Sequence, residues 1–281
     1  MSEITKPVPV AGGTLDARVG GRTGPALVFV HYWGGSADTW SGVIGHLGRG
    51  QATVRFDQRG WGTARALPGP YHLDRLADDL GRVVHACTPG PYVLVGHSMG
   101  GKVSQLLAAR RPAGLAGMVL VAPAPPKPPA TVTEEYRRTL SRAYDAPGTV
   151  RHALDHVLTA GPLPEAVRAT AVRDSLASGA GARQEWPLRG IAQDITRAAR
   201  DIEVPVTVLA AEHDVVEPPD VLRAYLLPHI PQAALVTVPA AGHLLPLEAP
   251  AAVATALDGF LSTLRHGAPT GSAGSALDAS G

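Results

Sequence analysis

Short apolar runs of strand length recur along this sequence, and stretches with helical spacing separate most of them. The apolar runs are ALVFVH at 26–31, ATVRFD at 52–57, YVLV at 92–95, GLAGMVLVAP at 114–123, VPVTVLAAEHD at 204–214 and AALVTVP at 233–239. Strands that alternate with helices form a mostly parallel sheet with helices on both faces. The sequence therefore predicts an α/β fold, with a hairpin formed by KPVPV and TLDARVG before the first buried strand.

One long stretch lacks strand signals and carries helical patterns broken by Gly and Pro. A connection between parallel strands needs only about a dozen residues, so this stretch is an insertion. We interpret residues 123–202 as a helical lid over one end of the sheet, and residues 1–122 and 203–265 as the core. Residues 266–281 are rich in Gly, Ala and Ser without periodicity, which predicts a disordered tail.

The composition narrows the class of protein. Of the 281 residues, 45% are hydrophobic and 17% are charged, which is enough to bury a large core. Lys and Arg number 25 against 24 Asp and Glu, so no nucleic-acid partner is indicated. The N-terminal stretch has no apolar signal region and no run reaches membrane-spanning length, so we expect a cytoplasmic protein without membrane association. The single Cys87 excludes an internal disulfide. We expect no metal and no cofactor, and the sequence carries no signal for the oligomeric state.

Residues 96–100 read Gly-His-Ser-Met-Gly and join an apolar run to a helical stretch. The pattern G-x-S-x-G between a strand and a helix is the nucleophile elbow, a tight turn that exposes a serine. Side chains at Gly96 and Gly100 would clash across such a turn. A Gly/Ser turn without chemistry is the alternative, but the strand before and the helix after it favour Ser98 as a nucleophile. We expect His97 to pack below the turn, because it cannot reach the Ser98 hydroxyl productively.

A serine hydroxyl needs a base to take its proton and a carboxylate to orient that base. His243 lies in a Gly-containing loop after the last predicted strand, at the same edge of the sheet as Ser98. Asp214 lies just past the preceding strand and gives the chain order Ser, Asp, His that accompanies this elbow. Glu212 and Glu217 are its neighbouring competitors. We predict that Ser98, Asp214 and His243 form a catalytic triad.

The negative charge that develops on an attacked acyl oxygen requires two hydrogen-bond donors. The backbone N–H of Met99 follows the serine at a helix N-terminus, where the helix dipole favours negative charge. The second donor is expected in the loop after the first buried strand, HYWGGSADTW at 31–40. We assign it to the backbone N–H of Trp33, whose indole would then face the pocket. A purely structural core aromatic is the alternative for Trp33.

Together these motifs resemble the α/β-hydrolase superfamily over about residues 8–265. GHSMGG is similar to the family's elbow, FDQRGWG at 56–62 resembles a structural loop of its lidded members, and HYWGGSADTW resembles its oxyanion loop. Tyr32 stands in that loop where the family usually has Gly. The resemblance implies an eight-stranded, mostly parallel sheet with helices on both faces and a helical lid inserted after strand 6. We expect Tyr32, Trp33 and the lid residue Trp186 to bind substrate.

The resemblance also implies a carboxylesterase-like serine hydrolase. We expect it to cleave an ester or related acyl bond of a small to medium substrate through an acyl-enzyme on Ser98. A C–C bond hydrolase, a lactonase or a perhydrolase would carry the same triad, so these alternatives stay open. A small-molecule receptor that kept the fold without chemistry is the alternative from another class.

Overall fold

The computed structural model describes residues 3–266, whose strands form one eight-stranded sheet in the order β1-β2-β4-β3-β5-β6-β7-β8. The strands are β1 Ile4–Val10, β2 Gly13–Gly20, β3 Thr23–Val30, β4 Gln51–Phe56, β5 Tyr92–His97, β6 Leu115–Val121, β7 Val206–Ala211 and β8 Ala233–Val238. The pairs β1–β2 and β2–β4 are antiparallel. Every further neighbouring pair, from β4–β3 to β7–β8, is parallel. The predicted α/β fold with a mostly parallel eight-stranded sheet is confirmed.

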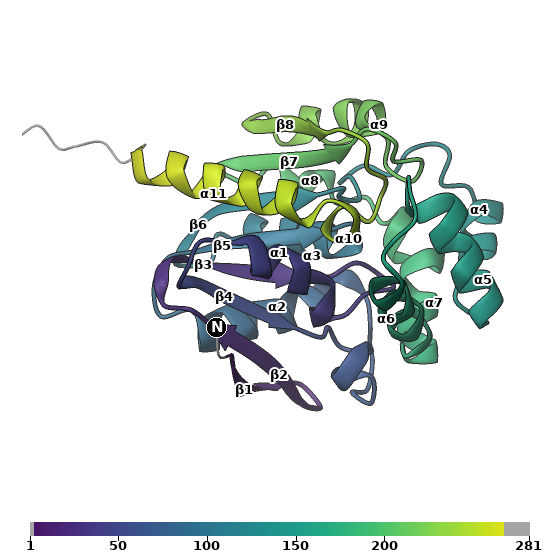
Figure 1. Cartoon of the computed structure of the whole chain (residues 1–281), viewed down its shortest axis with the longest axis horizontal. Coiled ribbons are helices and arrows are strands. Elements are labelled where there is room, and N and C mark those ends of the chain that lie inside the picture. Colours follow the sequence, from purple (N-terminus) through teal and green to yellow (C-terminus); the bar gives the residue numbers. More distant parts are fainter. Residues whose placement is uncertain (1–2, 267–281) are drawn as a thin grey trace, which may run out of the picture.

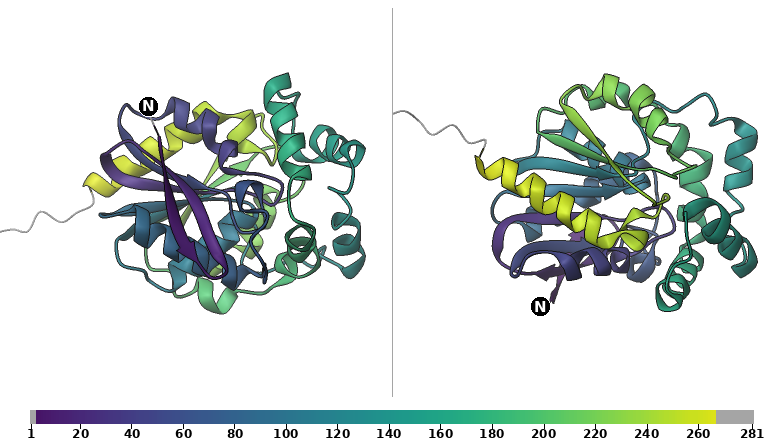
Figure 2. Two further views of the ribbon diagram at one scale, coloured as in Figure 1. Left: turned by 90° about the horizontal axis from the view of Figure 1, so that it is seen from below. Right: turned by 45° about the horizontal axis from the view of Figure 1, so that its top comes forward.

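Helices cover both faces of this sheet (Figures 1 and 2). They are α1 Ser41–His46, α2 Leu73–Cys87, α3 Met99–Ala109, α9 Pro219–Tyr225, α10 Leu245–Glu248 and α11 Pro250–His266. Successive residues of β3 point to opposite faces, so Val28 packs with α2 and α3 while Phe29 packs with α1 and α11. Each buried strand therefore contributes side chains to a core on each face of the sheet, which explains why its sequence is a continuous apolar run.

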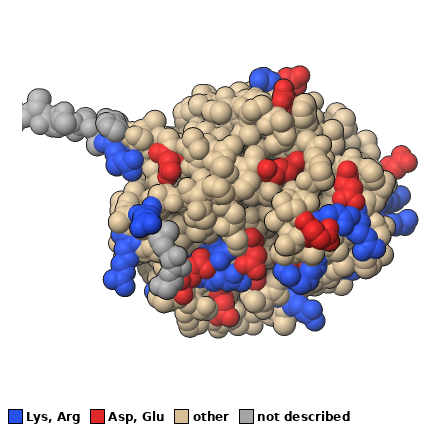
Figure 3. All heavy atoms as spheres, in the orientation of Figure 1, with Lys and Arg blue, Asp and Glu red and all other residues tan. Residues whose placement is uncertain are grey.

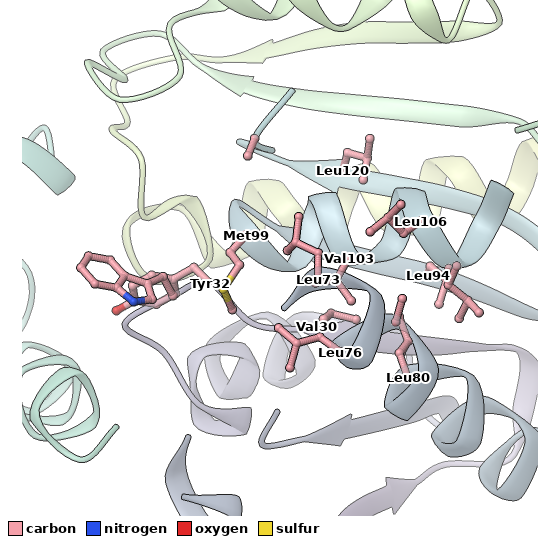
Figure 4. Packing of buried hydrophobic residues seen from close by; sticks show 14 of the residues in the cluster. Val30, Tyr32, Leu73, Leu76, Leu80, Leu94, Met99, Val103, Leu106 and Leu120 are labelled. Carbon is pink, nitrogen blue, oxygen red and sulfur yellow. The ribbon is translucent and has the colours of Figure 1, made fainter. Parts of the chain in front are cut away.

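The core on the α2 and α3 side reaches the end of the sheet where β5 meets α3. Figure 4 shows Leu76 and Leu80 of α2 packed with Val103 of α3, and Tyr32 and Met99 at one end of the same cluster. Burying each leucine side chain stabilises the fold by roughly 1.5–3 kcal/mol. The residues that begin α3 are thus held by a continuous core.

Residues 123–202, named the cap segment here, lie between β6 and β7. Their helices are α4 Glu134–Leu140, α5 Pro147–Ala153, a single π-helical stretch Leu154–Leu158, α6 Glu165–Leu176, α7 Ala180–Leu188 and α8 Thr196–Ala199. Helices α4 to α7 gather beyond the carboxyl ends of the parallel strands (Figures 1 and 2). The short helix α8 packs against α3 of the core. The cap segment thus stands at the edge of the sheet to which β5, β7 and β8 lead.

The last helix, α11, continues to His266, so the first residue of the predicted tail is helical. The rest of that tail, residues 267–281, lies outside the described residues. Within residues 3–266, no helix combines the length and the apolar character that crossing a membrane requires. The face drawn in Figure 3 carries Lys and Arg side by side with Asp and Glu, rather than a patch of one sign.

Candidate active site

Ser98 occupies the one-residue turn between β5 and α3. Its backbone angles are φ 52° and ψ −117°, a region that non-glycine residues enter only with strain. Four backbone hydrogen bonds hold the turn. The Ser98 N–H donates to the Val121 carbonyl at 3.1 Å, and the Ser98 carbonyl accepts from the N–H groups of Gly101 at 2.9 Å, Lys102 at 3.2 Å and Ala124 at 3.2 Å. The strained serine is therefore fixed by its neighbours on β6 and α3.

The two glycines of the motif allow the close approach of these backbones. A Cβ atom on Gly96 would lie 2.6 Å from the Gly100 carbonyl oxygen, across the turn. A Cβ atom on Gly100 would lie 2.5 Å from the carbonyl oxygen of His31, in the loop after β3. Neither glycine has a positive φ, so the reason for both is close approach rather than backbone freedom.

Ser98, His243 and Asp214 lie in one chain of hydrogen bonds. The Ser98 Oγ is 2.9 Å from His243 Nε2, and His243 Nδ1 is 2.9 Å from Asp214 Oδ2. All three side chains are buried, and they follow β5, β8 and β7 respectively at the carboxyl edge of the sheet. The structure therefore brings the three predicted residues together, with His243 between Ser98 and Asp214.

Asp214 is held as a carboxylate by several donors. Its Oδ1 accepts hydrogen bonds from the backbone N–H groups of Val216 at 2.8 Å and Glu217 at 3.0 Å. Burial alone would raise the pKa of Asp214, but the charge of His243, the hydrogen bond from its ring and these two N–H groups hold the pKa below its ordinary value. Of its two competitors, Glu212 accepts the Ala240 N–H instead, and Glu217 makes no ion pair with His243 within residues 3–266.

His97 supports the same histidine from below. Its Nε2 donates to the His243 carbonyl at 2.8 Å, and its ring lies 5.4 Å from that of His243 and 5.0 Å from that of Tyr32 between centroids. Burial, followed by the nearby charge of His243, lowers the pKa of His97 to about 3. His97 is therefore a neutral packing residue beneath the turn, as the sequence suggested.

The two N–H groups assigned to charge stabilisation are available as donors. Within the described part of the chain, neither the Met99 N–H nor the Trp33 N–H donates a hydrogen bond to another residue. Tyr32, which stands where glycine was expected, does not adopt a positive φ, so this loop accommodates it without that strain. Asp57 fixes the far end of the loop by accepting the Ala37 N–H at 2.7 Å.

The cap segment is joined to this loop by hydrogen bonds and a ring stack that no sequence motif predicts. The Ser175 Oγ on α6 donates to the Gly34 carbonyl at 3.0 Å, and the Ser36 Oγ donates to Asp174 at 2.6 Å. The Trp33 indole donates to the Arg183 carbonyl at 2.9 Å and stacks on Tyr144, with ring centroids 4.1 Å apart. No motif marks Ser175 or Asp174, because their partners are more than 130 residues away in the chain.

A cavity of about 630 Å³ opens onto Ser98 and His243. All three residues predicted to bind substrate, Tyr32, Trp33 and Trp186, line it. Further lining residues come from the cap segment and from the loop after β7: Tyr136, Leu140, Tyr144, Val157, Ile191, Val216 and Glu217. Within residues 3–266, no group of three His, Cys, Asp or Glu side chains is arranged to hold a metal ion. The lining of the cavity is mostly apolar, and Ser98 and His243 lie together in it.

Comparisons with known proteins agree with this geometry. A family model described as the alpha/beta hydrolase fold matches residues 25–250. A bifunctional esterase/perhydrolase of Acinetobacter calcoaceticus is 29% identical over 218 residues, which cover 71% of this chain and 78% of that protein. The 2-(acetamidomethylene)succinate hydrolase of Mesorhizobium japonicum is 25% identical over 274 residues, covering 92% and 95%. The solved structure of a thermophilic esterase from Thermogutta terrifontis superimposes with a TM-score of 0.76 at 25% identity, over 94% of this chain and 99% of that one.

Proposed function

Because this chain belongs to the alpha/beta hydrolase fold family and is a hydrolase, we propose that it cleaves an ester or related acyl bond through an acyl-enzyme on Ser98. The observation that carries the proposal is the hydrogen-bonded chain from Ser98 through His243 to Asp214, with 2.9 Å at both steps. It opens into a cavity of about 630 Å³, a size that suits small to medium substrates.

In the proposed reaction, the Ser98 Oγ attacks the acyl carbon while His243 Nε2 accepts the hydroxyl proton. Asp214 keeps the other proton of the ring on Nδ1 and stabilises the imidazolium that forms. The N–H groups of Met99 and Trp33 donate to the oxygen that becomes negative. His243 then gives its proton to the alcohol oxygen as the ester bond breaks. The alcohol departs, and the acyl group stays bonded to Ser98. A water molecule, deprotonated by His243, attacks this acyl-enzyme, and the proton returns to Ser98 as the acid leaves.

Perhydrolysis is the second candidate, because one relative is named as a bifunctional esterase/perhydrolase. Hydrogen peroxide would replace water as the attacking group on the same acyl-enzyme and release a peracid. The triad is common to both reactions, so the discrimination depends on which nucleophile the cavity admits in the second step. Peracid formation at the expense of acid, when peroxide is added to the ester assay, would support this reading.

The test of the proposal is covalent labelling and turnover of the Ser98→Ala variant. The wild-type chain is expected to hydrolyse p-nitrophenyl esters and to be labelled by a fluorophosphonate, whereas Ser98→Ala should do neither. Ser104→Ala is the matched control, because this buried serine lies on the same helix and donates to the Gly100 carbonyl at 2.8 Å. Labelling of Ser98→Ala at another residue, or unchanged turnover, would overturn the assignment.

A further inference from the structure

One acidic side chain in the cavity has no place in the proposed chemistry. Glu217 lies three residues after Asp214, in the loop between β7 and α9, and it lines the same cavity as Ser98 and His243. Its exposed fraction is 5%, and its Oε2 is buried without a hydrogen-bond partner among the described residues. A buried polar atom without a partner is costly, so its presence beside a substrate cavity points to a partner that arrives with the substrate.

Glu217 is not half of an ion pair. Lys102 on α3 is the positive charge that acts on it. Among residues 3–266 the two form no ion pair: Glu217 Oε2 has no hydrogen-bond partner, and the Lys102 Nζ donates to the Ile191 carbonyl at 3.3 Å. Burial, then the negative charge of Asp214, raises the pKa of Glu217 well above its ordinary value, although Lys102 lowers it in part. These surroundings favour the neutral carboxylic acid, which offers an O–H donor.

The cavity around Glu217 is otherwise largely hydrocarbon. Val216 precedes it in the loop, Leu140 lines the cavity from α4 and Ile191 from the cap segment. Tyr136 also lines the cavity, and this residue is 38% exposed. In an apolar pocket, a few polar groups fix the orientation of the ligand and decide which ligands are accepted. The phenols of Tyr32 and Tyr144 are buried in the same lining, but Glu217 is the one carboxyl group that lines the cavity among the described residues.

We propose that Glu217 determines specificity by donating a hydrogen bond to a neutral oxygen acceptor on the substrate, such as a second carbonyl or an ether oxygen. The enzyme then prefers esters that carry this second oxygen over esters in which a hydrocarbon group replaces it. The proposal rests on the acyl hydrolysis proposed for Ser98. A cationic substrate is disfavoured, because Lys102 acts on the same region and because the neutral acid carries no charge to attract it.

The test compares kcat/KM for matched ester pairs: p-nitrophenyl 4-oxopentanoate with 4-methylpentanoate, and p-nitrophenyl methoxyacetate with butanoate. A second series places the extra oxygen in the alcohol part. Glu217→Met removes the donor at similar length, with Glu217→Leu as a second apolar variant should Glu217→Met fail to fold, and Glu217→Gln keeps a donor. The ratio of oxygenated to hydrocarbon ester should fall about tenfold in the apolar variants, as expected for one neutral hydrogen bond. It should change by less than about twofold in Glu217→Gln, because the amide still donates.

The matched control is Asp220→Asn, a carboxylate in the same region whose side chain is 95% exposed and pairs with Arg223. Its ratio should equal that of the wild type. An unchanged ratio in the apolar variants with every pair would overturn the proposal. So would a preference of the wild type for an ammonium-bearing ester that Glu217→Gln abolishes, because Glu217 would then act as a charge. Each measurement compares kcat/KM for two esters with the same variant. The result for Glu217 can therefore be distinguished from a failure of the proposed function, in which Ser98→Ala would keep its activity.

Discussion

The ring and the backbone of His243 are held by two residues from different strands. Asp214, after β7, accepts a hydrogen bond from the ring Nδ1, and His97, at the end of β5, donates to the His243 carbonyl. A carboxylate can only accept, so the proton of the neutral ring stays on Nδ1 and Nε2 remains free to act as a base toward Ser98. The orientation of His243 therefore depends on the carboxylate of Asp214 and not merely on its bulk.

Replacing Asp214 by Asn should lower kcat by several orders of magnitude, roughly 10⁴-fold by analogy with another triad. The amide can donate to Nδ1, which favours the ring tautomer with its proton on Nε2, where the base is needed. Steady-state kinetics with p-nitrophenyl acetate measures the effect. Glu212→Gln is the control, since this carboxylate binds the Ala240 N–H instead, and it should stay within a few-fold of wild type. Near wild-type activity in Asp214→Asn would remove Asp214 from the proposed triad.

At the residue scale, sequence patterns could identify the candidate site residues that directly follow strands. Ser98, Asp214 and His243 each stand just past a predicted strand, and parallel strands bring such positions to one edge. Ser175 could not be found in this way, and the sequence named Glu217 only as a competitor of Asp214. Ser175 reaches the site only through the packing of the cap segment, and Glu217 matters because of its burial, which no local pattern reports.

At the scale of elements, the cap segment and the loop after β3 form one hydrogen-bonded unit. Helix α6 contributes Ser175, which binds the Gly34 carbonyl, and Tyr144 stacks on Trp33. A lid that only covered the cavity would change which substrates enter. A cap that also positions the Trp33 N–H should change how fast every substrate reacts, because oxyanion donors act by being held in place.

Ser175→Ala should therefore lower kcat for short and long p-nitrophenyl esters alike, by about tenfold, with little change in KM. Complete removal of an oxyanion donor costs about 10²–10³ in kcat, and loosening its loop should cost less. Ser178→Ala is the matched control, because its hydroxyl binds the Ser175 carbonyl and not the loop.

Trp186→Ala supplies the contrast, since Trp186 lines the cavity from α7. It should change the ratio of kcat/KM between long and acetyl esters, by roughly 10–200-fold for a lost pocket contact. If Ser175→Ala altered only this ratio, the positioning role of α6 would be wrong. If Trp186→Ala scaled all esters equally, the substrate-binding role of Trp186 would be wrong.

At the scale of the whole molecule, the fold was predictable because short stretches of sequence indicate each strand and helix by themselves. Each buried strand reads as an apolar run, since it faces a core on both sides, and the alternation with helices dictates a parallel sheet. The arrangement of the cap helices was not predictable to the same degree. Helix α6, for example, buries only Ala171 and Ser175, so its sequence has no clear apolar stripe to indicate what it packs against.

The buried histidine under the site should make the stability of the whole chain depend on pH. His97 has its ordinary pKa of about 6.5 when the chain is unfolded, but a pKa of about 3 in the folded chain. Between these values the unfolded state binds one more proton than the folded state. His97 therefore leaves the free energy of unfolding unchanged above about pH 6.5, and it lowers this free energy as the pH decreases from 6.5 toward 3. At pH 5 the pKa difference contributes a loss of about 2 kcal/mol, since each pH unit below 6.5 costs about 1.4 kcal/mol.

Urea unfolding of wild type and of His97→Gln at pH 5.0 and pH 7.5 measures this contribution. Glutamine places an amide donor near the position of Nε2, so it can still bind the His243 carbonyl, but it does not titrate. Glu217 is present in both proteins, and its raised pKa affects both equally, so the comparison cancels its contribution. The wild type should lose about 2 kcal/mol more than His97→Gln between the two pH values. Equal losses in the two proteins would mean that His97 is protonated in the folded chain at pH 5, contrary to its burial against His243.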